Sequence, residues 1–255
     1  MEALKVDNLF ISFGGVQALH DVSFSVETGE KLAIIGPNGA GKTTLFNVLN
    51  GQLPPSEGRI YLYGKDITGL PTHSRAHLGL SRSFQITSLF TPLTVLENCL
   101  LALQGTRPSR FQMFRSITSY QHLFTKAQDL LGMVELWEKR TEPVKNISYG
   151  EQRRLEIALS LASEPKLLLL DEPSAGLTAG ESAAVVDMIY NLGEGITALI
   201  VDHDMDLVFG VAQRIIVLHY GEIIAEGAPE TVRNDSRVRE IYIGTEEGTE
   251  NAGAS

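Results

Sequence analysis

The length, composition and charge of the chain exclude several classes of protein. With 255 residues, 43% of them hydrophobic and 20% charged, the chain can bury a sizeable core and differs from disordered chains. Its formal net charge of -10 disfavours duplex nucleic acid as a partner, because such affinity depends on clustered Lys and Arg. We therefore expect a compact globular protein with no nucleic-acid partner.

Features of the N-terminus, the apolar runs and the single cysteine indicate where the protein works. The first residues lack the apolar stretch of a secretory signal. The longest apolar runs, 99–103 and 167–170, are far shorter than the roughly 20 residues that span a bilayer. Cys99 lies in an apolar stretch and is typical of a buried thiol in a reducing compartment. We expect a cytoplasmic protein that needs a partner for any work in a membrane.

The first quarter of the chain is predicted to be mainly β-structure. β-Branched and aromatic residues in partial alternation predict strands at residues 4–11, 17–26, 31–35 and 58–63. A glycine turn at 14–15 joins the first two strands. The strand 31–35 is followed by a glycine-rich loop and a helical run at 44–49, which is the order of a phosphate-binding unit.

The middle of the chain is predicted to be helical, from about residue 91 until a strand at 167. Six residues spaced alternately by four and three predict one face of a long amphipathic helix. They are Met113, Ile117, Tyr120, Phe124, Ala127 and Leu131. We interpret this face as packing inside a helical subdomain.

The last third returns to short apolar strands, at 167–170, 197–201 and 214–218. A helical segment at 181–192 separates the first two. This alternation predicts a mainly parallel α/β core. The segment 244–255 is rich in Gly, Glu, Thr and Ala, and we expect it to be frayed.

A glycine-rich segment after the strand 31–35 matches the phosphate-binding P-loop pattern in full. Its glycines let backbone N–H groups turn toward phosphate oxygens, and the following helix directs its positive end at the same anion. We expect the lysine to lie against the β and γ phosphates of a nucleotide. The candidate nucleotide-binding residues here are Gly36, Pro37, Asn38, Gly39, Ala40, Gly41, Lys42, Thr43 and Thr44.

A magnesium ion is expected beside this loop, because Mg²⁺ combines few protein ligands with phosphates and water. Thr43 supplies a suitable hydroxyl. The strand 167–170 ends in Asp171, which can direct a carboxylate to the metal, and Glu172 can polarise an attacking water. An Asp-Glu pair alone is also compatible with an exposed turn, but beside a P-loop it favours catalysis.

The segment Ser148–Gln152 precedes a predicted helix at 153–162 and has two interpretations. Ser148 can be a simple N-cap of that helix. Alternatively, its hydroxyl, the Gly150 backbone and the helix N-terminus form a second phosphate-binding group. One chain hardly needs two such groups unless ATP is held between two chains.

The chain resembles the ABC ATPase family over nearly its whole length. Ser148–Gln152 is similar to the family's signature segment, from which Tyr149 and Glu151 depart. The resemblance implies an α/β fold, with a P-loop NTPase core of ABC ATPase type, an antiparallel β subdomain and an inserted helical subdomain. The implied boundaries are 1–90 and 164–244 for the core, 91–163 for the helical subdomain and 245–255 for a flexible tail.

The resemblance also implies cofactors and residue roles, namely ATP and Mg²⁺ bound in a head-to-tail dimer. Phe13 would stack on adenine, and the signature residues Ser148, Gly150 and Gln152 would contact the nucleotide of the facing chain. Glu172, His203 and Gln85 are the implied catalytic residues. The implied magnesium ligands are Thr43, Gln85 and Asp171.

Two further segments receive roles from the same resemblance. Ser174–Thr178 resembles the D-loop, with Thr178 where an Asp is usual; this departure concerns communication between the two ATP sites and not ATP binding. Residues 86–96 would lie beside a cytoplasmic helix of a permease, in a groove between Gln85 and the helical subdomain. Packing within the subdomain explains these apolar residues equally well.

Among importers, the chain looks most like the ATPases for branched-chain or hydrophobic amino acids. The similar segments are 13–15, 148–157, 175–178 and 241–244. The resemblance implies two permease subunits, a homodimer or a heterodimer with a sister ATPase, an indirect solute-binding partner outside the cytoplasm, and a peripheral position on the cytoplasmic face of the plasma membrane. A soluble ATPase of iron-sulfur cluster assembly, a nucleotide-binding regulator without turnover and, less favoured, a chromosome-organising ATPase remain alternatives.

Overall fold

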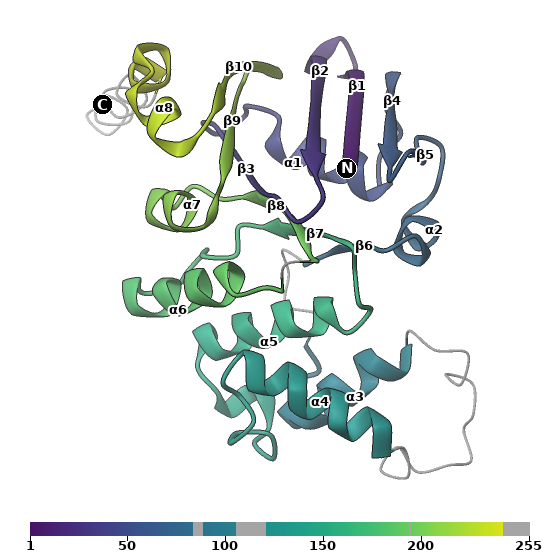
Figure 1. Cartoon of the computed structure of the whole chain (residues 1–255), viewed down its shortest axis with the longest axis vertical. Helices are drawn as coiled ribbons and strands as arrows, with labels where there is room; N and C mark the ends of the chain where they lie inside the picture. The colour runs from purple at the N-terminus through teal and green to yellow at the C-terminus, as the bar shows by residue number, and fades with distance from the viewer. Residues whose placement is uncertain (84–88, 106–120, 194, 242–255) are drawn as a thin grey trace.

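The computed structural model describes residues 1–83, 89–105, 121–193 and 195–241. Its central layer is a six-stranded sheet in the order β10-β9-β3-β8-β7-β6 (Figure 1). All neighbours in it are parallel except β10 and β9. The strands are β3 (Lys31–Ile35), β6 (Leu80–Arg82), β7 (Leu167–Asp171), β8 (Thr197–Val201), β9 (Arg214–His219) and β10 (Glu222–Gly227). Every residue of β7 and β8 is buried, which explains their continuous apolar sequences.

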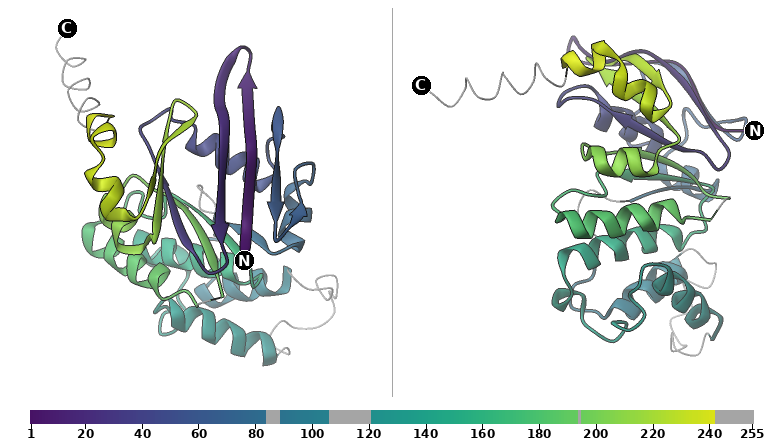
Figure 2. Two further views of the ribbon diagram at one scale, coloured as in Figure 1. Left: turned by 45° about the horizontal axis from the view of Figure 1, so that its top comes forward. Right: turned by 60° about the vertical axis from the view of Figure 1, so that its left-hand side comes forward.

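A second, antiparallel sheet has the order β2-β1-β4-β5. It consists of β1 (Glu2–Phe13), β2 (Val16–Glu27), β4 (Glu57–Leu62) and β5 (Lys65–Asp66). The helix α1 (Lys42–Asn50) shares one buried core with both sheets, through side chains such as Leu9, Leu32 and Phe46. This core fixes the loop before α1 between the two sheets (Figure 2).

The opposite side of the six-stranded sheet is covered by helices. α3 (Val95–Gly105), α4 (Gln121–Met133) and α5 (Tyr149–Leu161), with the short η3 (Val144–Asn146), lie together in the lower part of Figure 1. They share a core with α6 (Ala179–Tyr190), α7 (Met205–Val211) and the β7 side chains Leu168 and Leu170. Two shorter helices, α2 (Thr72–His77) and α8 (Pro229–Asn234), precede β6 and follow β10. None of the helices within the described ranges is both long and apolar enough to cross a membrane.

The sequence predicted this architecture correctly, and the α/β class with a mainly parallel core is confirmed. The strands expected at 31–35 and 197–201 have the predicted bounds. Strands β5, β6 and β10 were not predicted. β6 consists of Leu-Ser-Arg at the sheet edge, which is too short and too polar to show a periodic pattern.

Two expectations about helices need correction. The helix expected at 153–162 begins at Tyr149, because Ser148 caps it. In α4, Phe124 does not belong to the buried face: it is 40% exposed, whereas Leu123, Ala127 and Leu131 are buried. The rest of the expected face (Met113, Ile117 and Tyr120) and the segment 244–255 lie outside the described residues. The subdomain boundaries stay predictions.

Candidate functional site

The loop between β3 and α1 borders a hollow of about 360 Å³. Gly36 packs so closely on β9 that a Cβ atom there would lie 2.1 Å from the carbonyl oxygen of Leu218. Gly41 has a φ of 103° and directly precedes α1, so the positive end of that helix faces the loop. The hollow is lined by Val16, Gln17, Ala18, Asn38, Gly39, Ala40, Gly41, Lys42, Thr43, Thr44, Glu172 and Tyr220.

The ammonium group of Lys42 is held inside this loop. Its Nζ donates to the carbonyl oxygens of Gly36, at 2.7 Å, and Pro37, at 2.9 Å. Burial lowers the pKa of Lys42, whereas the charges of Glu172 and Asp171 oppose that effect. Both carboxylates therefore act on the same ammonium, but only Glu172 lines the hollow, because Asp171 is buried at the end of β7.

The end of β7 supplies these two carboxylates. Asp171 is 1% exposed, and its Oδ2 accepts from Nη2 of Arg82 at 2.5 Å. Glu172 has a φ of 47°, a left-handed conformation that is unfavourable for a residue with a side chain. Its N–H donates to the carbonyl oxygen of Val201 at 2.7 Å, which holds this turn against β8. The strained turn places Glu172 at the hollow.

A second group of donors lies at the start of α5. Ser148 forms a capping box with Glu151: the Ser148 Oγ accepts from the Glu151 N–H at 3.2 Å, and Glu151 Oε2 accepts from the Ser148 N–H at 2.9 Å. The Gly150 N–H donates to Glu181 Oε1 at 3.2 Å. Gln152 Nε2 donates to the carbonyl oxygen of Ile147 at 3.2 Å. None of these residues lines the hollow at Lys42, so one chain does not bring the two groups together.

Asp202 links the segment after Glu172 to His203. Its carboxylate is 1% exposed and accepts from the Ser174 hydroxyl at 2.7 Å and the Ser174 N–H at 2.9 Å. It also accepts from the backbone N–H groups of His203, at 2.7 Å, and Asp204, at 2.9 Å. The His203 side chain itself is 68% exposed. One buried carboxylate thus fixes the backbone of both segments.

The sequence matches the family model described as "ABC transporter" over residues 19–175. The chain belongs to the ABC transporter family. Residues 222–248 match a second model, "Branched-chain amino acid ATP-binding cassette transporter". The chain is 38% identical over 248 residues to the high-affinity branched-chain amino acid transport ATP-binding protein LivG of Escherichia coli, covering 94% of this chain and 97% of LivG.

Two solved structures of ATP-binding cassettes have the same fold. The ADP conformation of MJ1267, an ATP-binding cassette of an ABC transporter, superposes with a TM-score of 0.86 at 36% identity, covering 96% of this chain and 99% of that one. The dimeric post-hydrolysis state of the cassette MJ0796, bound to ADP and Pi, superposes with a TM-score of 0.73 at 27% identity, covering 89% and 98%. These likenesses confirm the ABC ATPase fold.

The structure brings most of the predicted site residues of this ABC protein into two separate groups. The P-loop residues and Glu172 lie around one hollow, while Ser148, Gly150 and Gln152 lie at the start of α5. Phe13 is 49% exposed at the end of β1 and does not line the hollow, whereas Val16, across the hairpin from it, does. Gln85 lies outside the described residues. These roles stay predictions.

The sequence did not predict the roles of two arginines, one in β6 and one in α5, that contact the end of β7. Arg82 holds the Asp171 side chain, as described above. Arg153, in α5, donates to the carbonyl oxygens of Asp171, at 3.1 Å, Glu172, at 2.5 Å, and Pro173, at 3.2 Å. Arg153 thereby ties the helix that carries Ser148 to the turn that carries Glu172. Arg153 lies in the segment 148–157 that resembles the importer ATPases, but an arginine in a helix is usually a solvated charge, so its contacts with the end of β7 were not predicted.

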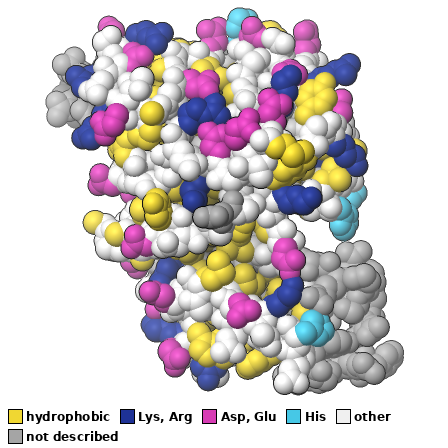
Figure 3. Space-filling model, in the orientation of Figure 1, with side chains coloured by type: hydrophobic (Ala, Val, Ile, Leu, Met, Phe, Trp, Pro, Cys, Tyr) yellow, Lys and Arg dark blue, Asp and Glu magenta, His cyan; other side chains and the backbone are white. Residues whose placement is uncertain are grey.

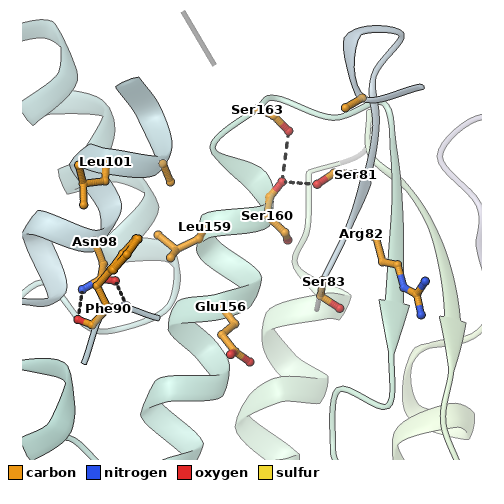
Figure 4. Close-up of a pocket in the computed structure, with 12 residues that line it drawn as sticks. Ser81, Arg82, Ser83, Phe90, Asn98, Leu101, Glu156, Leu159, Ser160 and Ser163 are labelled. Carbon is orange, nitrogen blue, oxygen red and sulfur yellow. Dashed lines mark hydrogen bonds between the residues drawn. The ribbon is translucent and has the colours of Figure 1, made fainter. Parts of the chain in front are cut away.

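A groove of about 400 Å³ lies between β6, α3 and α5. Phe90 is 58% and Leu101 39% exposed at its edge, and Asn98 fixes Phe90 through two backbone hydrogen bonds of 2.8 and 3.1 Å (Figure 4). Arg82 also lines the groove, although its guanidinium is directed away from Leu159 and toward the sheet. Residues 86–88, part of the segment 86–96 that was expected beside a permease helix, lie outside the described residues.

Proposed function

We propose that this chain is the ATP-hydrolysing subunit of an ABC importer, bound peripherally to the cytoplasmic face of the plasma membrane. The observation that carries the proposal is the Lys42 ammonium, held inside the P-loop and acted on by the charges of Glu172 and Asp171. A lysine and backbone N–H groups bind the terminal phosphates of a nucleotide, and a nearby carboxylate accepts a proton from the attacking water. Glu172 is the proposed base, with His203 and Gln85 contacting the γ-phosphate and the water.

The residues around Lys42 fit a magnesium ion. Within the described ranges, no cluster of three His, Cys, Asp or Glu side chains could hold a metal alone. Mg²⁺ bound with phosphates needs only one or two protein ligands, and Thr43 and Asp171 flank Lys42 from α1 and β7. Thr43, Asp171 and Gln85 would hold the ion, which neutralises developing phosphate charge when bound.

The working form is proposed to be a dimer in which Lys42 of one chain and Ser148 of the other bind the same ATP. The separation of the two donor groups within one chain supports this arrangement. The dimeric ADP-bound state of the related cassette MJ0796 supports it as well. The second chain is either a copy of this one or a sister ATPase.

The proposed cargo is a branched-chain or hydrophobic amino acid, delivered by an extracytoplasmic binding protein to two permease subunits. The similarity to LivG and the match of residues 222–248 support this choice over iron-sulfur cluster assembly. The groove beside Phe90 is the proposed seat of a permease helix. On the face in Figure 3, acidic and basic side chains are interspersed, without the continuous basic stripe of a nucleic-acid-binding protein.

Nucleotide binding by the purified chain tests the proposal. A fluorescent ATP analogue should bind the parent protein in a magnesium-dependent manner, and Lys42→Ala should weaken that affinity about a hundredfold or more. Lys126→Ala, which removes an exposed ion pair with Glu164, is the matched control and should bind as the parent does. Uptake of labelled leucine by cells that contain this chain and its permeases should disappear with Glu172→Gln. Absence of magnesium-dependent nucleotide binding in the parent would overturn the proposal.

A further inference from the structure

The carboxylate of Glu181 lies against the start of α5, the helix that carries the signature segment. Its Oε1 accepts from the Gly150 N–H at 3.2 Å and from the Ser148 hydroxyl at 3.4 Å. The approach is close, because a Cβ atom on Gly150 would lie 2.5 Å from the same Oε1. The first turn of α5 is therefore covered by a negatively charged oxygen from α6.

Helix capping does not explain this contact. Glu181 caps α6 with its other oxygen, Oε2, which accepts from the Thr178 N–H at 3.1 Å and the Thr178 hydroxyl at 2.9 Å. Glu97 forms the same kind of cap before α3, where Oε2 alone accepts from the Thr94 N–H and hydroxyl, at 2.8 and 3.0 Å. Capping thus needs one oxygen of the glutamate, and Oε1 of Glu181 is available for the start of α5.

Oε1 resembles a phosphate oxygen in charge and in its preference for hydrogen-bond donors. The N-terminus of a helix stabilises either anion, and a single N–H group serves one strong acceptor at a time. The donors that hold Oε1 are the Ser148 hydroxyl and the Gly150 N–H. The proposed function assigns Ser148 to the nucleotide of the facing chain, and the resemblance to the ABC ATPase family implies the same role for Gly150. Glu181 and that nucleotide therefore compete for the same two donors.

We propose that Glu181 occupies the phosphate-binding donors of Ser148 and Gly150 in the separated chain and must leave them before the ATP of the facing chain binds there. The inference rests on the proposed function, because it concerns the same shared site. Because Glu181 must first be displaced, ATP-driven association of the chains is weaker than it would be if the Ser148 and Gly150 donors were unoccupied. Glu181 can leave without unfolding α6, since the capping contacts through Oε2 are separate. The same Thr178, Gly150 and Ser148 donors lower the pKa of Glu181, so it is charged at neutral pH.

The variant Glu181→Gln tests the inference, because glutamine preserves the capping box but removes the competing charge. Both parent and variant carry Glu172→Gln, which should prevent turnover because Glu172 is the proposed base. Association is followed by analytical ultracentrifugation as MgATP is raised, for the chain alone and with its sister ATPase. For each shared ATP site that carries Glu181→Gln, we expect the ATP concentration at half-maximal association to be about threefold lower than in the parent. A change of this size is typical of an exposed charge interaction.

Glu97→Gln is the matched control, because it alters the same kind of cap at α3, where the Glu97 carboxylate accepts from Thr94 and not from Ser148 or Gly150. It should leave the association curve unchanged. Hydrogen exchange supplies a second measurement on the nucleotide-free monomer: the amides of 149–151 should exchange severalfold faster in Glu181→Gln and at the parent rate in Glu97→Gln.

The outcomes separate the two proposals. If the parent associates with ATP but Glu181→Gln needs as much ATP or more, the competition by Glu181 is overturned while the proposed function stands. If the parent associates neither alone nor with its sister ATPase, the shared ATP site of the proposed function is overturned. Hydrogen exchange then decides the Glu181 contact by itself, and equal exchange in parent and variant overturns it.

Discussion

Arg82 and Asp171 form a buried ion pair across the neighbouring strands β6 and β7. Nη2 of Arg82 lies 2.5 Å from Oδ2 of Asp171, and the two side chains are 8% and 1% exposed. Nη1 of the same guanidinium donates to Oδ1 of Asn47 at 2.7 Å and to Oε1 of Gln52 at 3.1 Å. One arginine thus connects the strand beside the groove, the proposed magnesium ligand and the helix after the P-loop.

Replacing Arg82 by methionine should lower the free energy of unfolding by about 3 kcal/mol, because the Asp171 charge would remain buried without a partner. Urea denaturation at neutral pH measures the change. Adding Asp171→Asn to Arg82→Met should cost less than the sum of the two single variants, since the second change removes the stranded charge.

The control for this prediction is Arg237→Met, which removes an arginine paired with Asp235 while itself 66% exposed. Such exposed pairs contribute little, about 0 to 1 kcal/mol. An Arg82→Met variant no less stable than Arg237→Met would show that the buried pair does not hold Asp171 in place.

Two glycines of the P-loop should respond differently to alanine. At Gly36 a Cβ atom would lie 2.1 Å from the carbonyl oxygen of Leu218, whereas at Gly39 no atom lies within 4 Å, although its φ is 80°. Gly39→Ala should therefore cost only backbone strain, about 1 kcal/mol. Gly36→Ala must displace the loop from β9, so it should lose both stability and nucleotide affinity.

Thermal unfolding and titration with a fluorescent ATP analogue compare these two variants. The melting temperature and the nucleotide affinity should both be highest for the parent, lower for Gly39→Ala and lowest for Gly36→Ala. Equal effects of the two substitutions would contradict the close packing of Gly36 on β9 as the reason for its glycine.

Asp202→Asn should destabilise the segment after β8. The Asp202 carboxylate accepts four hydrogen bonds, two from Ser174 and one each from the backbones of His203 and Asp204. An amide has a single acceptor oxygen: in the place of Oδ1 it would keep three of these bonds, while the NH₂ group in the place of Oδ2 would face the N–H of Ser174. We expect a loss of about 2 kcal/mol in urea denaturation, with faster hydrogen exchange at 202–204. Asp187→Asn, at an exposed position of α6, serves as the control. If Asp202→Asn were as stable as Asp187→Asn, the proposed role of the Asp202 carboxylate would be contradicted.

The sequence predicted elements best where burial is continuous. β3, β7 and β8 are mainly apolar runs between turn residues, and that pattern predicted the bounds of β3 and β8, and those of β7 to within one residue. β6 was missed because strand pairing with β7, and not its own residues, makes it a strand.

The P-loop was predictable for a related reason, since its chemistry lies in consecutive residues. Arg82 acts on a residue 89 positions away, and Glu181 on one 31 positions away. Neither type of residue is unusual in its local sequence. Their roles follow from which strands and helices are neighbours, which only the fold reveals.

Cys99 should be inert in the native protein. It lies in α3 with no exposed surface, in the core that also contains Val95, Leu103 and Leu131. Burial raises the pKa of its thiol to about 12, and the thiolate is the reactive form. At mildly alkaline pH a thiol-specific reagent should therefore label the native chain at least about a hundredfold more slowly than the chain in concentrated guanidinium.

The control for Cys99 is the double variant Cys99→Ala and Ser163→Cys, which moves the only thiol to an exposed position after α5. It should react at a similar rate in the native and the denatured chain. The comparison also measures opening of the helical part, because Cys99 becomes reactive only when α3 separates from α4 and α5. Native labelling of Cys99 as fast as that of the control would mean that this core is open in solution, in contradiction to the packing of Cys99.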